Sequence, residues 1–145
     1  MAKNGPKIQK HKQQSEFKKK LKNKKPLVNS GFFNYTTRYM SRKQGENFED
    51  WESDGILSRM MNRLRDMEQK SLMHNMGENF KPYPGFPPKN KTDFTWPTNV
   101  PPDANWASIR LGGTIRVIGH ILGNTFYIIF LDKNHRFWKS EKKHT

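Results

Sequence analysis

The chain has 145 residues, carries a formal net charge of +14 at pH 7 and contains no cysteine, which excludes a disulfide scaffold and a cysteine-ligated zinc site. No apolar run approaches the roughly 18–20 residues that cross a bilayer, and the basic N-terminus lacks the apolar stretch of a signal peptide. We therefore expect a cytoplasmic protein without a membrane segment, whose positive charge attracts phosphate-rich partners such as RNA or ribosomes.

Residues 1–26 form a lysine-rich segment that we expect to be a disordered tail. It holds ten lysines and one glutamate, and the mutual repulsion of the lysines opposes a stable fold. The tail has two interpretations: it keeps the protein solvated, or it becomes ordered on a nucleic acid. In the second interpretation, Lys18, Lys19 and Lys20 contact phosphate groups.

The remainder, residues 27–145, is expected to form a single α+β domain. Its first part, 31–48, is rich in aromatic side chains. Phe33 and Tyr35 alternate as in a strand, whereas Tyr35 and Tyr39 have the spacing of one helical face, so both structures stay open. We expect these aromatic residues to anchor the segment on the domain. The alternative is a surface that stacks on bases, with neighbouring basic residues on phosphates. Those basic residues are Arg38, Arg42 and Lys43.

A single long helix is predicted from about residue 54 to residue 74. Ser53 or Asp54 can cap its start, and Gly77 suits its end. Apolar residues at steps of three and four give the helix one apolar stripe. We expect this stripe to pack in the core rather than to line a binding groove. It consists of Leu57, Met60, Met61, Leu64, Met67 and Leu72.

Residues 77–105 contain seven of the nine prolines of the chain and are predicted to form a strap without regular structure. An unstructured connection of this length is unusual in a compact domain. Because the segment is also aromatic, we expect it to lie across the surface of the domain. Its aromatic residues are Phe80, Tyr83, Phe86, Phe94 and Trp96.

From 107 to 139 the pattern changes to the two-residue period of strands. The pairs Gly112-Gly113 and Gly123-Asn124 suit two-residue hairpin turns, which predicts three antiparallel strands. A further turn at 132–135 and a short strand at 136–140 would complete a three- to four-stranded antiparallel sheet. The long helix would pack on one of its faces.

The second hairpin determines which side chains share a face. With Gly123-Asn124 as the loop, His120 faces Tyr127, and Arg116 lies on the same side of the sheet. This polar face is either a half-exposed surface that meets water or a site, and apolar neighbours are expected on it: Ile109, Leu111, Ile118, Ile129 and Leu131. The opposite face would pack on the helix. It consists of Ile115, Val117, Gly119, Ile121, Phe126, Ile128 and Phe130.

The stretch WASIRLGGTIRVIGHILGNTFYIIFLDKNHRF, residues 106–137, resembles the C-terminal half of toxins of the RelE/ParE superfamily. Those toxins place a helical pair before an antiparallel sheet that carries basic strands and ends near a His-Arg pair. Here 109–111, 115–117 and His135-Arg136 match in order and spacing, while Phe137 stands where the family has a tyrosine. The whole chain also resembles a group of bacterial proteins, and this second resemblance implies no activity.

Superfamily members that cut mRNA on the ribosome use basic, His or Tyr side chains around the scissile phosphate and no metal. The resemblance therefore implies a metal-independent mRNA endoribonuclease or a ribosome-associated RNA-binding toxin, without a cofactor and with a small acidic antitoxin as partner. His135 would be the acid or base, with His120 second and Tyr127 beside them. The phosphate-binding residues would be Arg110, Arg116, Arg136 and Lys139, together with Lys18, Lys19 and Lys20 of the tail.

Two other classes of function stay open on the sequence. One is a nucleic-acid-binding accessory protein without catalysis, which the basic tail and the interleaved aromatic residues favour equally. The other is a structural or interaction protein of a phage or mobile element. A metal centre is not expected, because the five histidines are scattered and neither an HxxxH nor an HExxH spacing occurs.

Overall fold

The computed structural model of the chain describes residues 15–16 and 31–140. Apart from Ser15 and Glu16, the expected disordered tail at 1–26, with its three phosphate-binding lysines, therefore lies outside the described residues. The described residues 31–140 belong to one compact unit. The structure of this unit confirms the α+β class. Among the residues that the structure describes, no helix combines the length and the apolar character needed to cross a bilayer.

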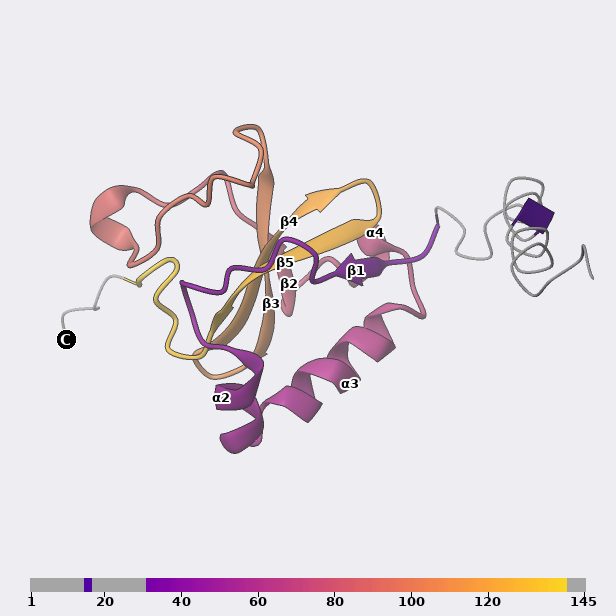
Figure 1. The fold of residues 1–145 in the computed structure, drawn as a ribbon, viewed down its shortest axis with the longest axis horizontal. Helices are drawn as coiled ribbons and strands as arrows, with labels where there is room; N and C mark the ends of the chain where they lie inside the picture. The colour runs from indigo at the N-terminus through magenta and orange to yellow at the C-terminus, as the bar shows by residue number, and fades with distance from the viewer. Residues whose placement is uncertain (1–14, 17–30, 141–145) are drawn as a thin grey trace, which may run out of the picture. The chain divides into compact units, whose positions relative to one another are not determined.

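A five-stranded mixed sheet forms the centre of this unit, in the order β1-β5-β4-β3-β2 (Figure 1). The three long strands are β3 (Asn105–Gly112), β4 (Ile115–Leu122) and β5 (Thr125–Asp132), joined as an antiparallel meander. Two three-residue strands, β1 (Asn34–Thr36) and β2 (Phe80–Pro82), form the edges. Because β1 runs parallel to β5, the prediction of a purely antiparallel sheet was wrong.

In place of the long helix expected at 54–74, the structure has two helices, α3 (Leu57–Met67) and α4 (Leu72–Asn75). A further helix, α2 (Phe48–Ser53), precedes them and was not predicted. The hydroxyl of Ser71 caps α4 by accepting the backbone N–H of His74. Ser71 thus starts a new helix instead of lying inside a longer one.

Gly55 explains why α2 and α3 are separate. Its φ of 71° is left-handed, and its N–H donates to the carbonyl of Glu52 while the N–H of Ile56 donates to that of Trp51, at 3.0 and 2.8 Å. This pair of bonds is the Schellman motif, which ends a helix at a glycine. Asp54 is therefore the C-terminal cap of α2 and not the start of a helix, as the sequence had suggested.

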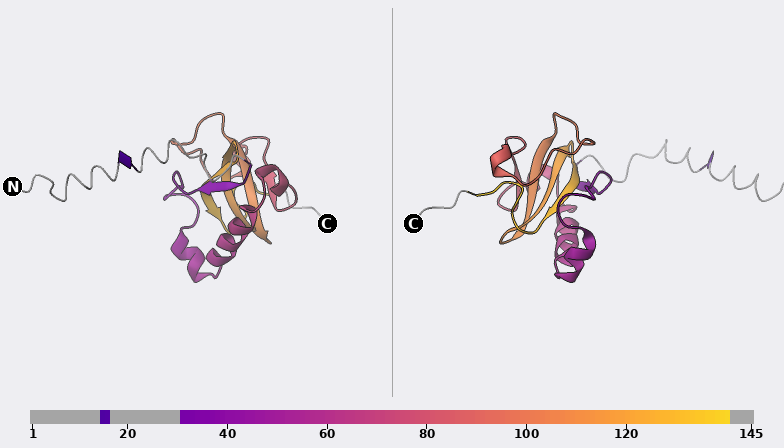
Figure 2. Two further views of the ribbon diagram at one scale, coloured as in Figure 1. Left: turned by 90° about the vertical axis from the view of Figure 1, so that its right-hand side faces the viewer. Right: turned by 60° about the vertical axis from the view of Figure 1, so that its left-hand side comes forward.

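Helices α2, α3 and α4 contribute the apolar side chains that pack on one face of the sheet, and the apolar stripe of α3 lies in this first core as expected (Figure 2). Met60, Leu64 and Met67 are buried, whereas Met61 is 46% exposed. The strands contribute the other half of the first core. Their buried residues are Phe80, Ala107, Ile109, Leu111, Val117, Phe126, Ile128 and Leu131.

The proline-rich strap covers the opposite face of the sheet (Figure 2). It contains β2 and a short 3₁₀ turn, η1 (Lys89–Lys91), so the prediction that it lacks regular structure was wrong there. Its aromatic residues pack inward on a second core that contains Trp106: Phe94 is buried there, and Phe86 and Trp96 are partly buried against it. The polar face of the sheet is therefore covered instead of half-exposed.

The first hairpin turns one residue later than expected. The turn residues are Gly113 and Thr114, and a register shift between Arg110 and Gly112 precedes them. As a result, Arg110 lies directly opposite Arg116. Ile109 and Leu111, which were expected on the polar face, lie in the first core instead.

The second hairpin has the expected register from its loop, through the pair of His120 with Tyr127, as far as the pair of Gly119 with Ile128. Between Ile118 and Gly119 a β-bulge shifts the pairing by one residue. Beyond it, Phe130 packs in the second core and Leu131 in the first, which is the reverse of the prediction. The expected strand at 136–140 is an irregular segment.

Candidate phosphate-binding and catalytic site

Two arginines face each other across neighbouring strands at one end of the strap-covered face. Arg110 of β3 is paired with Arg116 of β4, so both side chains project from the same side of the sheet. Like charges directly opposite each other destabilise a sheet. Within residues 31–140, neither arginine forms an ion pair with a carboxylate. Such a pair of cations can be stabilised by a bound anion.

The guanidinium of Arg116 is buried and fixed in place. The residue is 7% exposed, and its Nη1 donates to the carbonyls of Gly113 and Ile115 at 2.7 and 3.1 Å. Burial, followed by the charge of Arg110, lowers the pKa of Arg116, although an arginine stays protonated at neutral pH. Both of these hydrogen bonds use Nη1, which leaves the other nitrogens of the Arg116 guanidinium to bind a ligand.

The segment after β5 brings His135 to the two arginines. The fully buried carboxylate of Asp132 accepts the backbone N–H groups of Arg136 and Phe137 at 2.9 and 2.8 Å, which closes a tight turn around His135. Burial and then the charge of Arg116 lower the pKa of His135 below its ordinary value of 6.5. The imidazole is therefore neutral at pH 7 and able to accept a proton.

Tyr83 completes the group from the strap. Its backbone N–H donates to the carbonyl of Trp106 at 2.8 Å, and its ring stacks on Trp138 with centroids 5.4 Å apart. Burial raises the pKa of Tyr83 above its ordinary value, although a hydrogen bond with Ser108 and the charge of Arg116 oppose this shift. The phenol is thus protonated at neutral pH. We call Tyr83, Ser108, Arg110, Arg116, Asp132 and His135 the arginine cluster.

His120 and Tyr127 lie apart from this cluster. They stack on each other with ring centroids 4.7 Å apart and planes within 3°, and Tyr39 stacks on the outer side of Tyr127. His120 is 6% exposed, and burial lowers its pKa. It is four residues from Arg116 along β4, or about 13 Å at the usual rise of a strand. The structure therefore places these two predicted catalytic residues in a separate aromatic stack.

Arg136 and Lys139 are engaged with a carboxylate. Arg136 Nε lies 2.8 Å from one oxygen of Asp93, and Lys139 Nζ contacts the other oxygen. These two hydrogen bonds lower the pKa of Asp93. The ion pairs tie the segment after β5 to the strap, so their first role is structural. Of the predicted phosphate-binding residues that the structure describes, Arg110 and Arg116 are brought together with His135.

Sequence reasoning missed Tyr83 and Ser108. Tyr83 is far from the arginines along the chain and reaches them only because β2 pairs with β3. Ser108 alternates with Arg110 on β3, but the sequence did not indicate the register shift between Arg110 and Gly112, and without this shift Ser108 falls on the opposite face.

No protein-family model, curated protein or solved structure matches this chain. The resemblance to RelE/ParE toxins therefore stays an expectation from the sequence. Function has to be inferred from the chemistry of the arginine cluster.

Proposed function

We propose that the protein binds RNA at the arginine cluster and cleaves it there without a metal ion. The observation that carries this proposal is the pair Arg110 and Arg116, opposed on adjacent strands next to the neutral imidazole of His135. Among residues 31–140 no carboxylate forms an ion pair with either arginine. The net charge of +14 supports a polyanionic ligand.

The two arginines would hold the non-bridging oxygens of a phosphodiester. Guanidinium groups bind phosphate in a bidentate manner, and this geometry also stabilises the extra negative charge of the transition state. The two cations exceed the single carboxylate of Asp132, so a phosphate group restores the charge balance of the cluster.

His135 would act as the general base and Tyr83 as the general acid. His135 takes the proton of the ribose 2′-hydroxyl, and the 2′-oxygen forms a bond to phosphorus. The bond from phosphorus to the 5′-oxygen breaks, and the phenol of Tyr83 gives that oxygen a proton. The products are a 2′,3′-cyclic phosphate and a free 5′-hydroxyl. The half-exposed indole of Trp138, stacked on Tyr83, offers a face for a neighbouring base.

The resemblance to RelE/ParE toxins extends the proposal to a substrate and a partner. The substrate would then be mRNA on the ribosome, and the partner would be a small acidic antitoxin. Expression of the protein from an inducible promoter in a bacterium, with growth and mRNA integrity as readouts, tests this extension. Normal growth with intact mRNA would contradict this extension. The cleavage chemistry itself is tested on purified protein.

The decisive experiment measures cleavage of a single-stranded RNA in buffer that contains EDTA. We expect the wild-type protein to cleave and Arg110→Gln to lower the rate about 10²–10³-fold, as removal of one electrostatic group commonly does. Arg65→Gln is the matched control, because Arg65 is exposed on α3 and belongs to neither core. A 2′-deoxy nucleotide at the cleaved position should block the reaction.

The same experiment can reveal a second function, which is RNA binding without cleavage. Arg116 is largely buried and bonded to its own hairpin, which suits a phosphate anchor that performs no chemistry. RNA that binds the wild-type protein, stays intact and dissociates more readily from Arg110→Gln would establish a binding module. Wild-type protein that neither binds nor cuts RNA would overturn both functions.

A further inference from the structure

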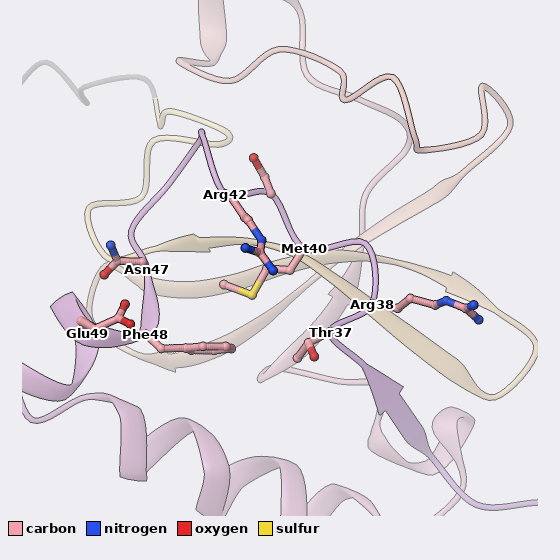
Figure 3. A pocket seen from close by; sticks show the side chains of 8 residues that line it. Thr37, Arg38, Met40, Arg42, Asn47, Phe48 and Glu49 are labelled. Atoms are coloured by element: carbon pink, nitrogen blue, oxygen red, sulfur yellow. The ribbon is translucent and has the colours of Figure 1, made fainter.

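A second concave feature lies outside the arginine cluster. The connection from β1 to α2 runs along β5, with the N–H groups of Ser41 and Glu46 donating to the carbonyls of Ile129 and Leu131 at 2.8 and 3.0 Å. Beside it opens a cleft of about 500 Å³, which we call the β1–α2 cleft (Figure 3). It is lined by Thr37, Arg38, Met40, Ser41, Arg42, Asn47, Phe48 and Glu49.

The β1–α2 cleft has two walls suited to a flat ring. The ring of Phe48 lies on one side, and the side chains of Met40 and Arg42 lie across from it (Figure 3). Phe48 is half-buried against the first core, which holds its ring in place. Aromatic rings and guanidinium planes are the surfaces on which single-stranded nucleic acids stack their bases.

Charges of opposite sign line this cleft without neutralising each other. Glu49 and the arginines at positions 38 and 42 are exposed, and no ion pair joins them within residues 31–140. A carboxylate is an acceptor only, so Glu49 offers two oxygens to the donors of a ligand. The guanidinium of Arg42 offers a phosphate contact at the mouth of the cleft, whereas Arg38 points away from Phe48 and Met40 (Figure 3).

Asn47 places an amide donor next to this acceptor. The side-chain Oδ1 of Asn47 accepts the backbone N–H of Asp50 at 2.9 Å, and the backbone N–H of Asn47 donates to the Asp50 carboxylate at 3.1 Å. This capping box fixes the orientation of the amide. Within residues 31–140, no hydrogen bond occupies its Nδ2, which leaves two N–H groups for a ligand.

We propose that the β1–α2 cleft binds a guanine base of RNA. Guanine is the base whose pairing edge has two adjacent donors, N1–H and the 2-amino group, followed by the acceptor O6. Glu49 would accept the two donors, Asn47 would donate to O6, and the base would stack between Phe48 and Arg42. Adenine presents its acceptor N1 where guanine has a donor, so the Glu49 carboxylate repels it. The inference rests on the proposed function in taking RNA as the ligand.

The test compares two uridine-rich RNAs that differ in one base, guanine or adenine, and carry 2′-O-methyl groups so that they are not cleaved. The wild-type protein should bind the guanine RNA about 10-fold more tightly, a usual preference for one bidentate base contact. Glu49→Gln should reduce this preference to about twofold or less, because an amide cannot accept both donors. Glu52→Gln, the same change on the same helix but outside this cleft, should retain it.

A second variant guards against a loss of structure. Asn47→Asp keeps an N-capping oxygen but replaces the amide donor with an acceptor. It should unfold at the same temperature as the wild-type protein and still lose the preference for guanine. Equal binding of the two RNAs by the wild-type protein, or a preference that survives Glu49→Gln, would overturn the guanine site.

The same assay distinguishes a cleft that does not select guanine from a protein that does not bind RNA. Arg110→Gln should weaken the binding of both RNAs equally, because it removes a phosphate-binding group and no base-binding group. If neither RNA binds the wild-type protein, the RNA function falls, and titration with GMP and AMP decides the cleft. A preference for GMP that depends on Glu49 would support a site for a free guanine nucleotide, and its absence would overturn the inference.

Discussion

His135 is held in a backbone conformation that costs free energy. Its φ of 58° lies in the left-handed region, which costs an ordinary residue about 1–2 kcal/mol. Residues in such conformations persist where their surroundings fix them, and they concentrate at functional sites. Here the buried carboxylate of Asp132 fixes the turn by accepting two backbone N–H groups beyond it. The strain is expected if His135 is retained for its imidazole and not for its contribution to the fold.

The first prediction separates the effect of His135 on the stability of the protein from its role in RNA cleavage. Asparagine adopts the left-handed conformation more readily than histidine does. We expect His135→Asn to leave the free energy of unfolding unchanged or to raise it by up to about 1 kcal/mol. RNA cleavage should fall at least about 100-fold, because the general base is gone. Urea unfolding and cleavage rates measure the two effects.

The control for this substitution is His74→Asn. His74 is exposed on α4 and lies outside the arginine cluster, so both its stability and its cleavage rate should stay near the wild-type values. A His135→Asn protein that is clearly less stable and still cleaves RNA would contradict the assignment of His135 as the base.

The second prediction concerns the dependence of stability on pH. Burial lowers the pKa of His120 below its ordinary value of 6.5, so the unfolded chain binds this proton more readily than the folded one. As the pH falls through about 6.5, stability is lost until the pKa of the folded state has been passed. We expect the free energy of unfolding to be lower at pH 5 than at pH 7 for this reason.

His120→Phe is the test, because it removes the titrating group and keeps a ring on Tyr127. The variant should lose less stability than the wild-type protein between pH 7 and pH 5 in urea unfolding. His135 titrates in the same direction, and Asp132, whose pKa burial raises, titrates in the opposite one. Both groups are present in the wild-type protein and in the variant, so their contributions cancel when the two losses of stability are compared. Equal losses would show that His120 titrates normally.

Among the strands, the second hairpin was predictable from sequence and the first was not. Gly123-Asn124 offers a single position for a two-residue turn, so the register near it follows directly. The run from Gly112 to Thr114 offers two adjacent positions for a turn, and both place Ile109 and Leu111 on the face of Arg116. Only the register shift between Arg110 and Gly112 turns these two residues into the first core. A local pattern cannot supply that information, because it depends on what packs on each face.

The other features of the fold that the sequence did not predict have their own physical causes. The bulge in β5 falls within a run of almost uninterrupted apolar residues, where no alternation marks the face that each side chain takes. The pairing of β1 with β5 joins segments far apart in sequence. In the candidate site, Arg116 and His135 were foreseen from the sequence, whereas the approach of Tyr83 required knowledge of how the strap crosses the sheet.

The third prediction tests the bulge. A Cβ atom on Gly119 would lie 2.0 Å from the carbonyl oxygen of Tyr127 and 2.8 Å from the ring of Phe126. We expect Gly119→Ala to destabilise the protein by about 1–3 kcal/mol or more, because both neighbours must move. Gly85→Ala is the control, since a Cβ there meets no atom within 4 Å. Thermal unfolding of the two variants gives the comparison, and equal midpoints would contradict the bulged register.

At the scale of the molecule, the fourth prediction concerns the lysine-rich tail, which lies almost entirely outside the described residues. Deletion of residues 1–26 should leave the melting temperature of the remaining domain nearly unchanged. It should weaken RNA binding and flatten its salt dependence, by about 0.7 in the slope of log K against log salt for each phosphate of a single strand that the lysines no longer neutralise. An unchanged slope would mean that the lysines do not bind the RNA.

Two cores on opposite faces of one sheet give the domain its layered plan. The helices cover one face, the proline-rich strap covers the other, and the arginine cluster sits where the strap and the segment after β5 meet the end of the sheet. Both segments reach the cluster as irregular chain, Tyr83 from the strap and His135 from the tight turn. The sheet supplies the two arginines, and the irregular segments supply Tyr83 and His135, the proposed acid and base.

The parallel pairing of β1 with β5 also determines when the domain can be completed. The hydroxyl of Thr125 in β5 donates to the side chain of Asn34 in β1 at 2.6 Å, across 91 residues of chain. Pairings of such long range form slowly, because the loop must be closed, at a cost in entropy, before the strands can bond. A ribosome makes β1 and all three helices before it makes the meander, so the apolar stripe of α3 has no sheet to cover it. The growing chain is thus most open to aggregation and proteolysis during synthesis, and this period ends only when β5 has been translated.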